Sequence, residues 1–186
     1  MAIQPSDNTT SPQPKTNVWV RLLTGLIGIP IFMGAVIIGD WAMLAVAIAL
    51  VTISSIEYYY MERNRGVQNN VVLGLLMSGG VLAAFLLENL SLLIGVLLIG
   101  ASIAFIAEYW RCRHPQKSFL RTLTTMAGVF YVAFPGAMAL TIRGDSLLGL
   151  QWFIAILGTT WSVDTFSFLA GKIFGTRLLL PRISPQ

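Results

Sequence analysis

The sequence carries little charge and almost no cysteine or histidine. Charged residues make up 11% of its 186 residues and hydrophobic residues 55%, with one cysteine, Cys112, and one histidine, His114. A soluble domain carries roughly 25% charged residues, so this much apolar surface cannot be hidden in a water-soluble core. A single cysteine excludes an intramolecular disulfide. Both residues lie in a basic segment, and we expect neither to be catalytic.

The motifs of soluble enzymes are also lacking. The sequence has no Walker-type phosphate loop, no Gly-x-Ser-x-Gly elbow and no zinc-ligand spacing. Residues 1–17 are polar and lack the apolar core of a cleavable signal peptide, so we predict a disordered tail. The sequence has no internal repeat, which counts against the repeated halves of many transporters. What remains is an integral membrane protein of about one domain.

Long apolar runs dominate the rest of the chain. A helix that spans a bilayer needs about 20 mostly apolar residues. Six segments come close to this length, at residues 22–38, 41–60, 71–87, 90–107, 122–142 and 147–170. We therefore predict an all-α, polytopic membrane protein with a six-helix region over residues 18–170 and a Gly/Lys/Arg segment over residues 171–186. We expect Pro30 and Pro135-Gly136 to bend the first and fifth helices.

The basic residues are divided unevenly between the two predicted membrane faces. Eleven of the twelve Lys and Arg residues lie in the tail, in the 61–70 and 111–121 loops and in the C-terminal segment, whereas Arg143 lies on the opposite side. Basic residues accumulate on the cytoplasmic side of membrane proteins. We therefore expect both termini in the cytoplasm, and we attribute the net charge of +4 to this asymmetry, not to nucleic-acid binding.

One carboxylate, Asp164, falls within the sixth apolar segment. A charged side chain at mid-membrane costs about 2.5–3.5 kcal/mol on an insertion scale, so it should face a partner, a cavity or a cation. At helical spacing Thr160, Asp164, Ser167 and Gly171 share one face. Two interpretations stay open: a functional acid, or a buried acid that pairs with another helix for packing.

Polar residues near the same predicted face provide further candidates. Lys172 and Arg177 could contact phosphate, and the glycines around them would let a ligand approach the backbone. Basic residues after a span are also common topology anchors. Glu57, Glu108 and the acid of the sixth segment could together hold Mg²⁺. Alternatively, neighbouring arginines pair with the two glutamates.

Residues 161–186 contain a spaced set of aromatic, acidic, basic, glycine and proline residues. The set comprises Trp161, Asp164, Thr165, Gly171, Lys172, Phe174, Gly175, Pro181, Ile183, Ser184 and Pro185. In this pattern the chain resembles the phosphatidate cytidylyltransferases, also called CDP-diacylglycerol synthases. It departs from the pattern at Phe168, where a tyrosine is usual, and at Gln186, where a lysine is usual.

The resemblance implies a polytopic enzyme of the cell inner membrane that transfers CMP from CTP to phosphatidate, with Mg²⁺ as cofactor. It implies that Asp164 is catalytic and binds the metal, and that Lys172, Arg177, Arg182 and Ser184 bind substrate. Two alternatives stay open, a small transporter or channel subunit with Asp164 as ion ligand, and an inactive fragment.

The family's carboxy-terminal signature, which carries further acids, does not occur in these 186 residues. We therefore expect the chain to be the amino-terminal part of such an enzyme and to be inactive alone. The sequence leaves a homodimer open as its oligomeric state.

Overall fold

The computed structural model of the protein describes residues 18–144 and 148–174. The chain divides into two compact units, residues 1–34 and residues 35–186, and each is described by itself. The first helix, α1 (Val18–Ile38), passes through the boundary between the units and continues through Pro30. The other helices lie in the second unit, which holds the candidate site residues.

All regular structure in the described ranges is helical, which confirms the predicted fold class. After α1 come α2 (Asp40–Asn64), α3 (Val71–Leu86), α4 (Leu90–Cys112), α5 (Pro115–Gly128), the π-helical turn η1 (Val129–Ala133), α6 (Phe134–Gly144) and α7 (Gly149–Phe174). Because α5, η1 and α6 follow one another without a break, they form one rod that contains the fifth predicted span.

The lengths and compositions of these helices fit a membrane. In the described part of the chain, four helical segments are long and apolar enough to cross a bilayer, namely Asp40–Asn64, Leu90–Cys112, Pro115–Gly144 and Gly149–Ile173. Two shorter apolar helices, Leu26–Ile38 and Val71–Leu86, coincide with the remaining two predicted spans. The polytopic membrane class is therefore confirmed, and the crossing of all six segments stays a prediction.

Several helices extend into segments that we predicted as loops. α2 continues to Asn64 and α4 to Cys112, and α5 already begins at Pro115. A proline is well suited to the first turn of a helix, because its fixed φ matches the helix and its missing N–H would be unpaired there. Most of the predicted 111–121 loop is therefore helical, and its cations are held on two helix ends.

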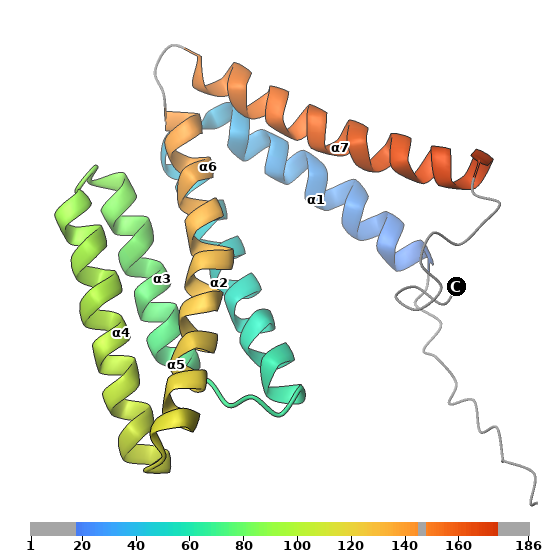
Figure 1. The fold of residues 1–186 in the computed structure, drawn as a ribbon. Coiled ribbons are helices and arrows are strands. Elements are labelled where there is room, and N and C mark those ends of the chain that lie inside the picture. The colour runs from blue at the N-terminus through green and yellow to red at the C-terminus, as the bar shows by residue number, and fades with distance from the viewer. Residues whose placement is uncertain (1–17, 145–147, 175–186) are drawn as a thin grey trace, which may run out of the picture. The chain divides into compact units, whose positions relative to one another are not determined.

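In the second unit, α3 packs against α2, α4 and α6, and α5 packs against α4 (Figure 1). The side chains buried in this bundle are mostly small or medium in size, while many Leu, Ile and Phe side chains are exposed on its outside. On α5, for example, Ser118 and Thr122 are buried whereas Phe119 and Leu123 are exposed. Apolar residues outside and small or polar residues inside are the arrangement expected when lipid is the solvent.

Tyr59 of α2 contacts α3 and α5 and is the largest fully buried side chain of the described residues. Its ring packs against Gly74 of α3 and Gly128 of α5. Its hydroxyl donates to the carbonyl of Thr125 at 2.9 Å. The Asn69 amide in turn donates to the Tyr59 carbonyl at 2.8 Å. The α2–α3 turn is thereby tied to the same crossing.

Arg143, the exception to the charge asymmetry, caps a helix end. Its guanidinium donates from Nε to the carbonyl of Val36 and from Nη2 to the carbonyl of Ile37, the latter at 3.1 Å. Carbonyls in the last turn of a helix lack partners within the helix, and a cation there is favourable. The adjacent Gly39 has a φ of 74°, and a Cβ at that position would collide with the guanidinium.

Where we predicted a bend at Pro135-Gly136, the structure has the π-helical turn η1, which ends two residues before the proline. The bend itself stays a prediction. Proline lacks an N–H, and its ring would clash in an α-helix with the carbonyl four residues earlier, that of Tyr131. A wider turn over these residues relieves the clash while the helix continues.

We predict that Gly74→Ala lowers stability, because a Cβ there would collide with the buried Tyr59 ring and hydroxyl. Overpacking of this kind costs about 1–3 kcal/mol, which should appear as a lower thermal midpoint in detergent. Gly79→Ala in the same helix is the matched control, since a Cβ there meets open space. Its midpoint should stay unchanged or rise slightly. Equal midpoints for both variants would contradict the packing described for Tyr59.

Candidate functional site

The predicted catalytic acid lies on an exposed helix. α7 packs against α6, yet nearly all side chains from 151 to 173 are exposed, with Phe153 as the buried exception. The helix continues past the predicted end at residue 170 to Phe174. Asp164 is therefore ten residues, or about 15 Å, from the described end of α7.

The predicted polar face of α7 is present. Thr160, Asp164, Ser167 and Gly171 lie at helical spacing on one side of the helix, and all are exposed. The Thr160 hydroxyl donates to the Ile156 carbonyl at 2.9 Å and so is satisfied within the helix. The Asp164 carboxylate forms no hydrogen bond or ion pair with any described residue. Within the described ranges, therefore, no helix supplies the partner that the packing interpretation requires.

Lys172 is the described member of the predicted substrate-binding set. It lies on α7 eight residues after Asp164, about 12 Å along the axis, and is exposed. At this separation the two charges do not pair with each other. The other predicted substrate-binding residues, Arg177, Arg182 and Ser184, lie outside the described residues.

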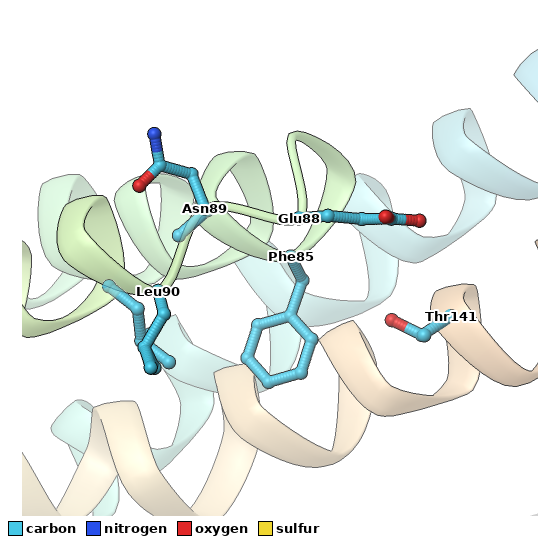
Figure 2. Close-up of a pocket in the computed structure, with 7 residues that line it drawn as sticks. Phe85, Glu88, Asn89, Leu90 and Thr141 are labelled. Carbon is cyan, nitrogen blue, oxygen red and sulfur yellow. The ribbon is translucent and has the colours of Figure 1, made fainter.

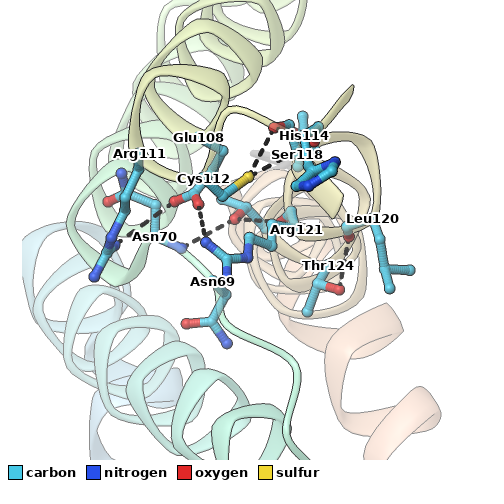
Figure 3. Close-up of polar contacts among 12 residues, drawn as sticks. Asn69, Asn70, Glu108, Arg111, Cys112, His114, Ser118, Leu120, Arg121 and Thr124 are labelled. Atoms are coloured by element: carbon cyan, nitrogen blue, oxygen red, sulfur yellow. Dashed lines mark hydrogen bonds and ion pairs between the residues drawn. The ribbon is translucent and has the colours of Figure 1, made fainter. Parts of the chain in front are cut away.

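Glu108 is a buried acid at the end of α4, and arginines surround it. Its side chain is 1% exposed. Its Oε2 is 3.2 Å from Nη1 of Arg121, and its Oε1 is 3.8 Å from Nη1 of Arg111 (Figure 3). The structure thus shows the arginine pairing that we left open as the alternative to a metal site. Sequence reasoning missed Arg121 as the main partner because it placed this arginine in a loop.

The three predicted acids do not gather at one place. Among the described residues, no group of three or more His, Cys, Asp or Glu side chains could hold a metal ion. Glu57 is exposed, and Glu108 is paired with arginines. Asp164 is exposed on α7 and belongs to no such group among the described residues. Mg²⁺ takes one or two carboxylates plus substrate phosphates, so Asp164 would fit Mg²⁺ as one protein ligand beside substrate oxygens.

Cys112 and His114 help to join α4 to α5. The Cys112 sulfur lies 3.1 Å from the Ser118 hydroxyl, and this hydroxyl donates to the His114 carbonyl at 2.9 Å (Figure 3). These contacts use the backbone of His114 and not its imidazole. The geometry therefore gives no thiol–imidazole pair of the kind that activates a cysteine nucleophile.

A pocket of about 300 Å³ lies beside the α3–α4 turn. Figure 2 shows the Phe85 ring between this turn and α6, with Glu88 and Thr141 nearby. Among the described residues of its lining, the charged one is an acid, Glu88, and none is a cation. The pocket also lies at the end of α3 and α4 that is far from the basic 111–121 segment. It is therefore unsuited to a nucleoside triphosphate.

We predict that Glu108→Gln destabilises the protein, because the largely buried Arg121, 17% exposed, would lose its counter-charge. Breaking a buried pair in this way costs about 3–5 kcal/mol. Thermal midpoints in detergent would measure the loss, with and without a metal chelator. Glu62→Gln is the control, since Glu62 pairs with the exposed Arg65 and should contribute about 0–1 kcal/mol. A loss that disappears in chelator would contradict the ion-pair role and indicate a metal ligand.

The matches with known proteins all point to the same family. The model of the Cytidylyltransferase family matches residues 19–186. The chain is 25% identical over 123 residues to the phosphatidate cytidylyltransferase of Rickettsia prowazekii (strain Madrid E). The matched region covers 64% of the chain and 50% of that protein. It is 25% identical over 212 residues to the chloroplastic phosphatidate cytidylyltransferase 4 of Arabidopsis thaliana. Here the matched region covers 96% of the chain and 53% of that protein.

A third relative, the phosphatidate cytidylyltransferase of Chlamydia pneumoniae, is 28% identical over 87 residues, or 41% of the chain and 28% of that protein. The chain spans about half the length of the first two relatives. No solved structure matches it. Because the family match extends from residue 19 to residue 186, the chain belongs to the cytidylyltransferase family.

Proposed function

We propose that this chain is part of a phosphatidate cytidylyltransferase, which transfers CMP from CTP to phosphatidate and forms CDP-diacylglycerol and pyrophosphate. The observation that carries the proposal is the family match over residues 19–186. Two exposed residues of α7 support it: Asp164, which pairs with no described residue, and Lys172. The three relatives named above are phosphatidate cytidylyltransferases.

The reaction brings a soluble nucleotide to a lipid headgroup. A phosphate oxygen of phosphatidate attacks the α-phosphorus of CTP, and the bond from this phosphorus to the oxygen of the leaving pyrophosphate breaks. Such a transfer depends on positioning the two phosphates and on stabilising their charge. A helix that is apolar over most of its length and basic near its end is suited to a boundary where both substrates can meet.

In this proposal Asp164 is one ligand of Mg²⁺, together with oxygens of the substrate phosphates. When bound, Mg²⁺ would neutralise phosphate charge in the transition state. Lys172 lies about 12 Å further along α7, and there it would bind a second phosphate as a point charge. We propose that Arg177, Arg182 and Ser184 complete the substrate-binding set.

We also propose that the protein lies in the cell inner membrane with both termini in the cytoplasm. The capping role of Arg143 supports this orientation, because it accounts for the basic residue that departs from the charge asymmetry. We further propose a homodimer as the working assembly. The exposed length of α7 supports it by offering surface for a second copy.

The test is Asp164→Asn in the full natural protein that contains this chain. If Asp164 binds the metal, the variant should insert and accumulate normally, because an amide is cheaper than a carboxylate in a membrane. Its transferase rate should fall by about 10²–10³-fold, as on loss of one group that stabilises a transition state. Yield after detergent extraction and incorporation of labelled CTP into lipid across a Mg²⁺ titration measure the two effects.

Glu57→Gln, which removes an exposed acid from α2, is the matched control and should keep both yield and rate. Arg177→Ala should mainly raise the KM for CTP if this arginine contacts phosphate. Normal yield together with normal rate in Asp164→Asn would contradict the proposed site. Poor yield with a normal rate per molecule would show that the acid serves packing.

A further inference from the structure

The exposed surface of α4 changes from apolar to aromatic to basic toward the end of the helix. Ile103 and Ile106 are exposed, and Tyr109 and Trp110 follow, the latter 79% exposed. Arg113 comes directly after the helix, ten residues from Ile103 or about 15 Å along the axis. In membrane proteins, apolar residues lie in the hydrocarbon core, Trp and Tyr at the interface, and basic residues just outside it.

The first turns of α5 show the same order in the reverse direction. Lys117 is exposed in the first turn, and Phe119 and Leu123 are exposed in the next two. The opposite face of the helix buries Ser118 and Thr122. An apolar outward face and a polar inward face predict that this side of α5 faces lipid, with its first turn at the level of the headgroups.

Tyr109, Trp110 and Arg113 together line a hollow of about 320 Å³. Arg113 has a left-handed backbone conformation, with a φ of 51°, which is uncommon outside glycine. Its N–H donates to the Tyr109 carbonyl at 2.8 Å. This turn brings the arginine back beside the two aromatic rings of the preceding helical turn.

Arg113 and Lys117 of this surface have no acid among the described residues to neutralise their charge. Glu108 is already paired with Arg121 and Arg111. The sequence has no Asp or Glu from residue 109 to residue 144. Arg113 and Lys117 are exposed and form no ion pair with any described residue. The hollow therefore lies in an uncompensated positive field at the predicted level of lipid phosphates.

We propose that the hollow of Tyr109, Trp110 and Arg113 binds the phosphate of an anionic phospholipid from the surrounding bilayer. The Arg113 guanidinium donates to two phosphate oxygens, as its planar fork allows. Lys117 adds a second positive charge from α5. Trp110 packs against the glycerol backbone and the first methylenes of the lipid. The site lies on α4 and α5, away from Asp164 on α7, and it does not depend on the proposed activity.

The experiment measures binding of phosphatidylglycerol to the purified protein in a mild detergent by native mass spectrometry, with phosphatidylcholine titrated in parallel. Arg113→Asn removes the charge and keeps a residue type that tolerates the left-handed conformation. One basic residue near an anionic lipid contributes about 1 kcal/mol, so the variant should bind its first phosphatidylglycerol about five-fold more weakly. Lys117→Gln should weaken it by a similar factor, and binding of phosphatidylcholine should not change.

Arg65→Gln is the control, because it removes the exposed cation directly after α2, which pairs with Glu62. It should leave phosphatidylglycerol binding unchanged. The proposal is overturned if both Arg113→Asn and Lys117→Gln bind phosphatidylglycerol as tightly as the Arg65→Gln control. It is also overturned if excess inorganic phosphate displaces the lipid, since the hollow would then be a free-anion site. Thermal midpoints without lipid would show that each variant is folded, and if one of them is not, the other decides the test.

Discussion

The helices of the second unit cross closely because Tyr59 is buried where α2, α3 and α5 meet. Two glycines, Gly74 and Gly128, make room for its ring. A phenol hydroxyl in an apolar medium must find a hydrogen-bond partner or lose several kcal/mol. The carbonyl of Thr125 provides that partner at 2.9 Å. The same contact therefore satisfies the hydroxyl and holds α5 against α2.

The position of α5 that follows from this crossing determines the neighbouring polar contacts. Arg121, one turn before Thr125, pairs with Glu108 of α4, and Ser118, two turns before it, contacts the Cys112 thiol. The polar groups on the inward side of α5 are thus mostly satisfied within the bundle. The cations that remain on its outer side, and the acid of α7, have no such partners among the described residues. Charged residues without a protein partner are candidate ligand-binding positions in a membrane protein.

Hydrophobic length predicted the helices well, because a bilayer allows few other structures to cross it. It predicted their ends poorly. The charges of the 111–121 segment suggested a loop, although Pro115 was a signal for a helix start that could have been used. Without that start, the pairing of Arg121 with Glu108 across thirteen residues could not be foreseen. Nor could the capping role of Arg143, since its partners in α1 are more than a hundred residues away.

For the candidate site, the shared face of Thr160, Asp164 and Ser167 followed from helical periodicity alone. The expected cluster of three acids did not form in the described residues, because burial beside arginines commits Glu108 to an ion pair. The roles of Asp164 and Lys172 stay predictions, as do those of Arg177, Arg182 and Ser184.

A soluble nucleotide can reach Asp164 only if the face of α7 that carries it is accessible to water, and this accessibility can be measured directly. A cysteine would be placed at Ser167, on this face, or at Phe166, on the opposite side of the helix, with Cys112→Ser as background. Labelling with a membrane-impermeant maleimide would then be followed in the intact membrane. The Ser167→Cys protein should react much faster than Phe166→Cys, and CTP with Mg²⁺ should slow it. Equal rates at the two positions, unaffected by CTP, would contradict the proposed site.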